Sequence, residues 1–513
     1  MKHYWQAKIN FDVDVLIPEN DPFYTLNEIL DSLDYSCLYN TYDRRWRRFY
    51  PHELFKIIVF AYMKGKYSAR DIEEACKTDI RFMAILNGST APDHATIARF
   101  QNGKLVSVIE NLFFQLVNKL AEMNEIHLTN LFVDGTKIEA YANRYSFVWK
   151  KVLSKNFVKL QDKMSAALSE IILRYGLKQD IDCITACNLL RQQAILQQVK
   201  FIYGSGKRKT QLQRDIEKIE EFLSKHKEYS IYLSNLGTRN SLSKTDPDAT
   251  FMRMKEDHMQ NGQLKPGYNI QIGVDSEYIV GVGSFPDRSD VNTLIPFLER
   301  IKKGTGKTYP NIIADAGYES EENYKYLTAN NQTSYIKPTN YERSKTKKYR
   351  DNISLCENMS YDRDRNEFIC HAGKRLHYIY TSREKTKSGF IVNKNNYRCE
   401  SCAECSYRSK CFKGKSADRV ICVSMDMMHL RKQSRANITT EYGIQLRMNR
   451  SIQVEGAFGV IKEDYGFRRF LTRGKKKTET QFMLLAIAFN IQKLYNKRSQ
   501  GRQNTELFSL KVA

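Results

Sequence analysis

The sequence predicts an α/β protein with a mixed sheet at its core, and three observations lead to that prediction. From residue 126 onward, apolar stretches of strand length alternate with stretches of helical period. A helical stretch rich in Lys, Gln, Glu and Leu interrupts this pattern at 149–244, and a basic, cysteine-rich and loop-rich stretch interrupts it at 341–430. We therefore expect a helical N-terminal domain over 1–125, followed by a core built from 126–148, 245–340 and 431–498.

The N-terminal domain is predicted mainly from apolar residues at helical spacing. Such spacing predicts a helix over Glu53–Tyr67, and Ser68 with Asp71 three residues later resembles a capping box that begins a second helix. Further helices are predicted over Ile80–Leu86, His94–Gln101 (preceded by Asp93) and Leu105–Met123. Strand-like alternation occurs only near Ile9–Ile17.

Short helices with tight connections are typical of a helix-turn-helix module that binds DNA. In that interpretation Arg70 and Arg99 are expected to face DNA, together with His94 and Thr96. The alternative is a helical bundle that serves only packing or dimerisation.

The strands of the core follow in a clear order. His127–Val133 is predicted as a strand that ends at Asp134, and Tyr268–Val274 with Tyr278–Val282 is predicted as a hairpin. Next come a helix over Asp290–Lys302, a strand over Asn311–Ala314, a helix over 320–330 and a strand over Ser334–Lys337. Helical pattern resumes near Gly443–Lys462, and Thr480–Tyr495 is apolar enough to be a buried helix.

The charge of the chain indicates its partner. There are 81 Lys and Arg residues against 58 Asp and Glu, which gives a formal net charge of +23. A surplus of this size predicts attraction to a polyanion, and nucleic acid is the expected one. No apolar run has the length of a membrane span, and the N-terminus lacks the layout of a signal peptide. We expect a cytoplasmic protein that does not associate with a membrane.

Two aspartates stand out because each follows an apolar strand. Asp134 follows Leu-Phe-Val, and Asp315 follows Asn-Ile-Ile-Ala. Two such carboxylates on neighbouring strands repel each other unless a cation lies between them, and hard cations such as Mg²⁺ prefer carboxylate ligands. Asp290 and Asp257 are weaker candidates because neither ends an apolar strand.

A third carboxylate, Glu455, lies in a predicted helix. Steps of three and four residues place it on one face with Arg447 and Lys462. Gly456 and Gly459 leave room there for a backbone or a ligand. Each acid alone is better explained as a cap or a solvated charge. Together with the strand order and the basic charge, the three favour a phosphodiester-cleaving site with two metal ions, Mg²⁺ or Mn²⁺.

Seven of the eleven cysteines fall between Cys356 and Cys422. Their spacing predicts a structural Zn²⁺ site, with ligands drawn from Cys370, Cys399, Cys402, Cys405 and Cys411. Cys356 lies upstream with Cys370, whereas His371 and Cys422 are substitutes, and the pattern does not decide which four bind. An iron–sulfur cluster and unligated thiols are the alternatives.

In its ordered motifs the chain resembles DDE transposases of bacterial insertion sequences. The matching segments are PHELFKIIVFAYMKGKYSARDIEEACKTDIRFMAILNG with PDHATIARF, FVDGTKIEAYANRYSFVWKK, GYNIQIGVDSEYIVG with SDVNTLIPFLERI, IIADAGYES, the cysteine cluster and RSIQVEGAFGVIKEDYGFRRF. They cover most of the chain in family order. No single motif is decisive, but the ordered set is specific.

The resemblance implies an RNase H-like core with Asp134, Asp315 and Glu455 as the catalytic triad. Lys462 matches a family lysine seven residues after the Glu. A Tyr and an Arg that some relatives carry upstream are here Met448 and Ser451, with Arg447 and Arg450 nearby, so the phosphate contacts of these arginines stay open.

The expected activity is metal-dependent cleavage and strand transfer of double-stranded DNA. The resemblance implies binding of the element's terminal inverted repeats and of a target DNA, with a homodimer that processes two ends together. It also implies a bacterial cytoplasmic location, in association with the nucleoid. The alternatives are a metal nuclease without strand transfer and a zinc-stabilised DNA-binding regulator.

Overall fold

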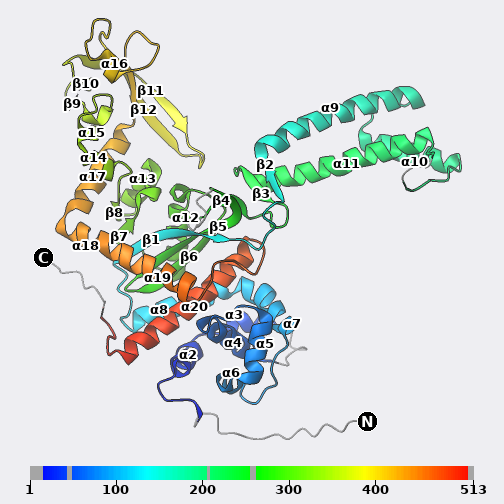
Figure 1. Cartoon of the computed structure of the whole chain (residues 1–513), viewed down its shortest axis with the longest axis horizontal. Helices are drawn as coiled ribbons and strands as arrows, with labels where there is room; N and C mark the ends of the chain where they lie inside the picture. The colour runs from blue at the N-terminus through cyan, green and yellow to red at the C-terminus, as the bar shows by residue number, and fades with distance from the viewer. Residues whose placement is uncertain (1–15, 43–48, 205–207, 255–261, 506–513) are drawn as a thin grey trace. The chain divides into compact units, whose positions relative to one another are not determined.

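A computed structural model describes residues 16–42, 49–204, 208–254 and 262–505 of the chain (Figure 1). It divides into two compact units. Unit 1 consists of 1–138 and 269–513, and unit 2 of 139–268. The strand-like segment predicted near Ile9–Ile17 lies almost wholly outside the described residues, as does Asp257.

The N-terminal part of unit 1 is helical, as predicted. It contains α2 (Pro22–Asp31), α3 (Ser36–Tyr39), α4 (Pro51–Met63), α5 (Ala69–Thr78), α6 (Ile80–Ile85), α7 (His94–Arg99) and α8 (Ile109–Glu122). The predicted cap at Ser68 is confirmed, since its hydroxyl accepts a hydrogen bond of 3.1 Å from the backbone N–H of Asp71. After α7 the helix continues through a π turn (η2, Phe100–Lys104) and a 3-10 turn (η3, Leu105–Ser107).

A mixed sheet forms the centre of unit 1. Its strands lie in the order β6 (Tyr278–Phe285), β5 (Leu264–Asp275), β1 (Asn130–Glu139), β7 (Asn311–Ala314) and β8 (Thr333–Ile336). β5 and β6 form the predicted antiparallel hairpin, whereas β1, β7 and β8 run parallel. The apolar residues of β1 and β7 are buried, so the polar residues that follow them are positioned by a rigid sheet.

Helices cover this sheet. α12 (Leu294–Thr305), which follows the 3-10 turn η4 (Asp290–Asn292), contacts β6, as does α20 (Lys475–Ser499). α20 is buried along much of its length, as its apolar sequence predicts. Its Asn490 side chain bonds both the N–H and the C=O of Ile279, each at 2.8 Å, and so satisfies the outer edge of β6. α13 (Glu321–Ala329) and α17 (Met425–Thr439) contact β8.

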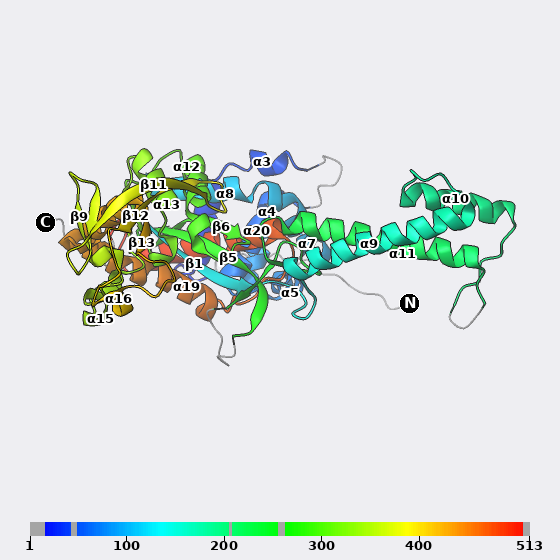
Figure 2. The ribbon, with the colours of Figure 1, turned by 90° about the horizontal axis from the view of Figure 1, so that it is seen from above.

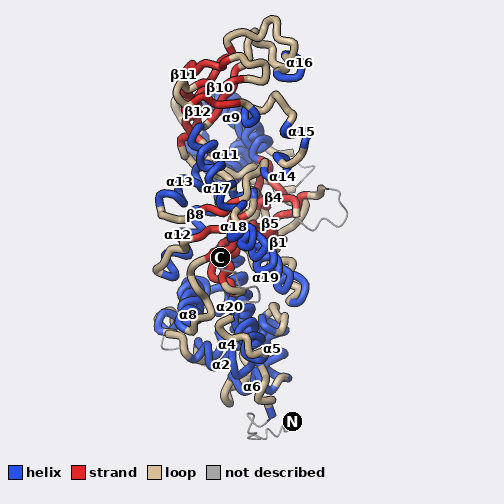
Figure 3. The backbone as a smooth tube through the Cα atoms, turned by 90° about the vertical axis from the view of Figure 1, so that its left-hand side faces the viewer, coloured by secondary structure: helices blue, strands red, loops and turns tan. Residues whose placement is uncertain are grey.

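The cysteine-rich insertion differs from the prediction, which expected mainly loops. It contains a five-stranded antiparallel sheet in the order β13, β12, β11, β10, β9. The strands are β9 (Ser360–Asp362), β10 (Glu367–Ile369), β11 (Arg375–Lys385), β12 (Ile391–Cys399) and β13 (Val420–Val423). They lie apart from the core sheet in both Figure 1 and Figure 3. The sequence analysis did not predict β11 and β12, because few of their side chains are buried and polar residues occupy both faces.

Two short helices precede this sheet, α14 (Tyr341–Ser344) and α15 (Lys347–Arg350), and α16 (Arg408–Cys411) lies in the loop between β12 and β13. A small apolar core, centred on Phe368, Leu376 and Tyr397, holds the insertion together.

Unit 2 consists mainly of the predicted long helices. α9 (Lys150–Tyr175) and α11 (Gln211–Leu236) pack side by side, and α10 (Cys183–Leu196) packs against them (Figure 2). Their apolar core includes Ile171, Leu190 and Ile216. At the base of the helices, β2 (Phe147–Trp149) pairs with β3 (Ser241–Ser243), and β4 (Thr250–Arg253) pairs with the first residues of β5.

Candidate active site

Asp134 lies within a strand and not at its end, which corrects the prediction. β1 continues for five residues beyond it, to Glu139. The prediction failed because the residues after Asp134, Gly-Thr-Lys, are not apolar, although they still extend the sheet. The parallel pairing with β7 stops at the pair Val133 and Ala314, so Asp134 is the first residue of β1 without a partner in β7. It is nearly buried, with 8% of its surface exposed.

Asp315 directly follows β7, as predicted, and begins a 3-10 turn (η5, Ala316–Tyr318). Its Oδ1 accepts a hydrogen bond of 2.8 Å from the backbone N–H of Gly317. The register of β1 and β7 makes Asp134 and Asp315 neighbours at the point where the two strands part. Burial, together with the negative charge of Asp134, raises the pKa of Asp315 above its ordinary value. The two carboxylates therefore lie close enough to repel each other.

Another carboxylate, that of Asp290, lies next to Asp315. Its Oδ1 accepts hydrogen bonds from the side-chain amides of Asn269 (2.6 Å) and Gln271 (2.9 Å), both on β5. A Cβ atom added at Gly317 would lie 3.0 Å from Asp315 Oδ1 and 3.3 Å from Asp290 Oδ2, so both carboxylates border this glycine.

The sequence analysis ranked Asp290 below Asp315 because it ends no apolar strand. The signal that could have found it is the pair of buried polar residues, Asn269 and Gln271, which alternate with apolar residues along β5. Two adjacent polar positions on the inner face of a central strand indicate a polar partner across the sheet.

Glu455 lies in a helix, as predicted, but this helix is not a regular α-helix. α18 (Glu441–Arg450) continues through a π turn (η7, Ser451–Glu455), a short α segment (α19, Gly456–Gly459) and a second π turn (η8, Val460–Asp464). Each π turn adds a residue to the period, so the face predicted from steps of three and four residues is shifted. Glu455 is exposed to solvent. A Cβ atom added at Gly456 or Gly459 would meet no atom within 4 Å, so no backbone approaches them among the described residues.

The same helix nevertheless reaches Asp134. Arg450 Nη1 donates a hydrogen bond of 2.9 Å to Asp134 Oδ2, and both side chains are largely buried. Arg450 was predicted to contact DNA, and here its side chain instead bonds a carboxylate of the candidate site. Among the described residues, no group of three or more His, Cys, Asp or Glu side chains is arranged to hold a metal ion. The structure thus brings Asp134 and Asp315 together but does not place Glu455 with them.

A basic groove of about 630 Å³ opens beside Asp315. Its cationic side chains are Lys337, Arg447 and Arg450, and its remaining lining is formed by Ala314, Ala316, Ile444, Met448, Ser451 and Ile452. Arg447 lies over the ring of Tyr341, 5.2 Å from its centre, and its buried Nε has no hydrogen-bond partner among the described residues. The groove thus offers positive charge next to a carboxylate, as a site that holds a phosphodiester requires.

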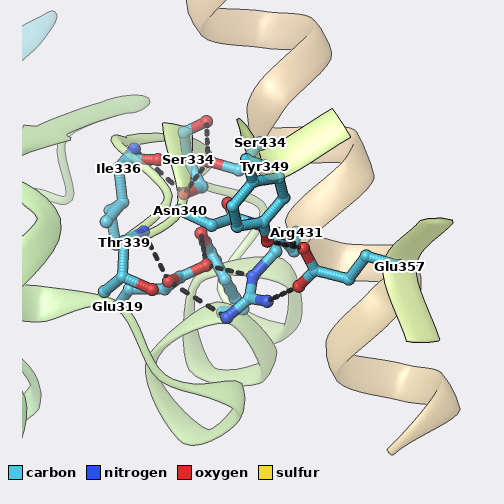
Figure 4. Close-up of polar contacts among 10 residues, drawn as sticks. Glu319, Ser334, Ile336, Thr339, Asn340, Tyr349, Glu357, Arg431 and Ser434 are labelled. Carbon is cyan, nitrogen blue, oxygen red and sulfur yellow. Dashed lines mark hydrogen bonds and ion pairs between the residues drawn. The ribbon is translucent and has the colours of Figure 1, made fainter. Parts of the chain in front are cut away.

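A partly buried ion-pair network holds the segment that follows Asp315 (Figure 4). Arg431 on α17 donates to both oxygens of Glu319, at 2.7 and 3.2 Å, and its Nη1 donates at 2.8 Å to Glu357 in the cysteine-rich insertion. Glu319 also accepts from the backbone N–H of Thr339 at 2.8 Å. The turn that carries Asp315, the end of β8 and the insertion are therefore tied to one helix.

The predicted DNA-facing residues of the N-terminal domain divide into two groups. Arg70, at the start of α5, and Arg99, at the end of α7, are exposed. His94 instead bonds Glu73 of α5, through its backbone N–H (2.8 Å) and its ring Nδ1 (2.7 Å), so it joins the two helices. The backbone N–H of Thr96 donates to the capping Asp93 at 2.8 Å.

Five cysteines of the insertion line one small pocket of about 20 Å³, together with His371 and Arg419. They are Cys370, Cys399, Cys402, Cys405 and Cys411. Burial raises the pKa of Cys399 to about 12, with a further contribution from Cys402. Arg419 Nη1 donates to Cys411 Sγ at 2.8 Å. The residues predicted as zinc ligands thus gather, but the described thiols are not arranged as a complete ligand set.

No helix in the described part of the chain combines the length and the apolar character needed to cross a membrane. A strongly basic α/β protein with paired carboxylates beside a cationic groove has the features expected of an enzyme that acts on a phosphodiester backbone.

Comparison with known families identifies that class further. Residues 369–495 match the transposase DDE domain, and residues 11–103 match a second transposase domain, DUF772. These two matches, each over less than half of the chain, support a DDE transposase of the insertion-sequence type. Glu455, Lys462 and most of the cysteine cluster fall inside the matched ranges, whereas Asp134 and Asp315 fall between them. Searches of curated proteins and of solved structures found no match.

Proposed function

We propose that this transposase binds the ends of its own element and cuts and joins DNA at a site built from Asp134, Asp315 and Glu455. The observation that carries the proposal is the placement of Asp134 and Asp315 as neighbours on two parallel strands, beside a groove lined by arginine and lysine. The order β6, β5, β1, β7, β8, with three parallel strands and an antiparallel hairpin, supports an RNase H-like core.

DDE transposase domains use divalent metal ions, typically Mg²⁺. The chemistry of the donors fits such an ion, because Asp134 and Asp315 are carboxylates that repel each other and that a bound cation would neutralise. Two bound metal ions would activate the attacking hydroxyl or water and stabilise the leaving oxygen. The protein itself orients the carboxylates through the Gly317 N–H and the Gly135 N–H, which donate to Asp315 and Asp134.

Glu455 completes the proposed triad. It lies five residues after Arg450, on a continuous helix that already contacts Asp134. In the proposed assembly Arg450 leaves Asp134 for a DNA phosphate, and the carboxylate of Glu455 takes part in metal binding. Arg447, Arg450 and Lys462 would hold the DNA backbone by charge, which positions the strand without reading its sequence.

The remaining parts of the proposal concern partners. α5 and α7 would present Arg70 and Arg99 to the terminal inverted repeats, as in a helix-turn-helix module. Two ends must be processed together, so we propose a homodimer in the synaptic complex. The pocket lined by five cysteines is the proposed place of a structural Zn²⁺ ion.

The proposal is tested by cleavage of a labelled DNA that carries the element's ends, with Mg²⁺ or Mn²⁺. Asp134→Asn, Asp315→Asn and Glu455→Gln are each expected to abolish cutting while DNA binding persists. Glu441→Gln, an exposed carboxylate at the start of the same helix as Glu455, is the matched control and should cut normally. Joined products distinguish a transposase from a nuclease. Cutting by the three triad variants at the wild-type rate would refute the site.

A further inference from the structure

The surroundings of Asp290 indicate a role that the three-carboxylate scheme does not include. Its Oδ1 is fixed by two amide groups, of which Asn269 is 1% exposed and Gln271 is fully buried. These two residues also bond each other, since Gln271 Nε2 donates to Asn269 Oδ1 at 3.0 Å. The hydroxyl of the buried Tyr318, in the turn after Asp315, donates to Gln271 Oε1.

This clamp leaves Asp290 Oδ2 directed at the candidate site. Oδ2 borders Gly317, the residue whose N–H holds Asp315. The clamp also packs against Gly135, the residue after Asp134 in β1, because a Cβ atom added at Gly135 would lie 2.3 Å from Gln271 Nε2 and 3.1 Å from Asn269 Oδ1. Asp290 is therefore built into the same rigid unit as both strand carboxylates.

The partners of Asp290 are neutral amides. They fix the direction of its carboxylate but do not neutralise its negative charge. In the described part of the chain neither Asp290 nor Asp315 forms an ion pair, and Arg450 pairs only with Asp134. A negative charge held next to a second one is costly unless a cation is present. Mg²⁺ keeps several of its waters when carboxylates bind it, and those waters need acceptors. Ligating carboxylates are commonly supported by such outer groups.

We propose that Asp290 is a positioning residue for metal binding: its Oδ2 accepts a hydrogen bond from a water on the metal ion at Asp315 and adds negative charge there. This inference rests on the proposed function. It predicts that the loss of the Asp290 charge lowers the affinity for the metal ion more than it lowers the rate at saturating metal.

The test uses the full-length protein without DNA and measures Mn²⁺ binding by electron paramagnetic resonance. Asp290→Asn keeps an oxygen acceptor for the two amides and removes the charge. We expect its Mn²⁺ Kd to rise about tenfold, within the range found for outer-shell partners. Asp287→Asn, three residues earlier in the same loop, is the matched control and should bind Mn²⁺ as the wild type does. Unchanged melting temperature and DNA affinity would show that the fold is intact.

A second variant separates charge from local packing. Asn269→Ala loosens the clamp but keeps the carboxylate, and we expect its Kd to rise less than that of Asp290→Asn. In cleavage assays, raised Mg²⁺ should restore Asp290→Asn to near the wild-type rate. If Asp290→Asn binds Mn²⁺ with the wild-type Kd while Asp134→Asn and Asp315→Asn lose binding, the inference is wrong and the proposed site stands. If Asp134→Asn and Asp315→Asn also bind normally, the proposed site itself is wrong.

Discussion

Arg450 Nη1 lies 2.9 Å from Asp134 Oδ2, so a cation of the protein itself neutralises one carboxylate of the candidate site. A metal ion at Asp134 must compete with this guanidinium. The same side chain lines the basic groove beside Asp315, where a DNA phosphate would attract it. Metal binding and DNA binding are therefore expected to favour each other through Arg450.

Arg450→Gln tests this competition. Without the guanidinium, the metal ion no longer displaces a positive charge from Asp134, so the Mn²⁺ Kd of the DNA-free protein should fall by about threefold or more. The affinity for DNA should fall at the same time, because one phosphate contact is lost. Arg447→Gln is the control, since Arg447 lines the same groove but does not pair with Asp134. It should weaken DNA binding alone. Weaker Mn²⁺ binding by Arg450→Gln would contradict the competition.

The raised pKa of Asp315 predicts the pH dependence of metal binding. Burial and the charge of Asp134 raise this pKa, so Asp315 holds its proton at a higher pH than an ordinary aspartate. A metal ion needs the ionised form. Mn²⁺ binding should therefore be lost as the pH falls through this raised pKa, and more Mn²⁺ should move the midpoint to lower pH. A midpoint that does not depend on the Mn²⁺ concentration would exclude Asp315 as the titrating ligand.

Without metal, the raised pKa of Asp315 makes the folded state less stable as the pH rises, whereas metal binding improves as the pH rises. A carboxyl group whose pKa is raised by folding contributes stability below its unfolded pKa and loses it as the pH rises through the folded value. Asp315→Asn should remove this contribution to the slope. The free energy of unfolding, measured by urea denaturation at several pH values with a chelator present, checks the sign.

Two glycines next to the candidate carboxylates allow a matched comparison of packing. A Cβ atom at Gly135 would lie 2.3 Å from Gln271, which cannot move freely because it holds Asp290 and Tyr318. Gly135→Ala should therefore displace the clamp, destabilise the protein by about 1–3 kcal/mol and strongly reduce cleavage. Gly456→Ala has open space around its Cβ in a helix, where Ala is more favourable than Gly, so it should keep the fold and should not lower the melting temperature. Equal melting temperatures for both variants would show that Gln271 accommodates the methyl group.

The sequence predicts an element correctly where burial alone determines its pattern of apolar residues. The apolar segment Asn311–Ala314 predicts its strand with the correct ends, because a short buried parallel strand is apolar on both faces. Asp315 was found for the same reason. β1 was predicted too short, since its second half pairs through backbone groups while its side chains are mixed. The strands β11 and β12 were missed because both of their faces are largely exposed, which leaves no apolar alternation.

The candidate site was predictable only in part, because contacts between residues far apart in the sequence leave no pattern in the residues around them. Asp290 is joined to Asn269 and Gln271 by side-chain bonds across about twenty residues, and nothing near Asp290 indicates them. Arg450 contacts Asp134 from a position 316 residues further along the chain. The π turns that follow Arg450 shift the helix face that carries Glu455, and a period of 3.6 residues cannot predict such turns.

Exposed arginines on α5 and α7 give a prediction for the N-terminal domain. Arg70→Ala and Arg99→Ala should each weaken binding to the element's ends and reduce the slope of log K against log salt by about 1, since each removes one phosphate contact. Neither side chain is buried, so the melting temperature should stay the same. Fluorescence anisotropy over a series of salt concentrations measures both quantities. Wild-type slopes for both variants would favour a packing or dimerisation role for these helices.

The last prediction compares a cysteine that lines the pocket with Cys422, which does not line it. Cys402 is buried and lines the pocket, whereas Cys422 on β13 is exposed and does not. If zinc holds the insertion together, the purified protein should contain about one Zn²⁺ per chain by elemental analysis. Cys402→Ser should lose that zinc and lower the melting temperature, and Cys422→Ser should keep both. Chelation should then unfold the insertion and release the Arg431–Glu357 ion pair, which joins it to α17. A zinc-free wild-type protein that melts at the same temperature with and without chelator would show that the thiols pack without a metal.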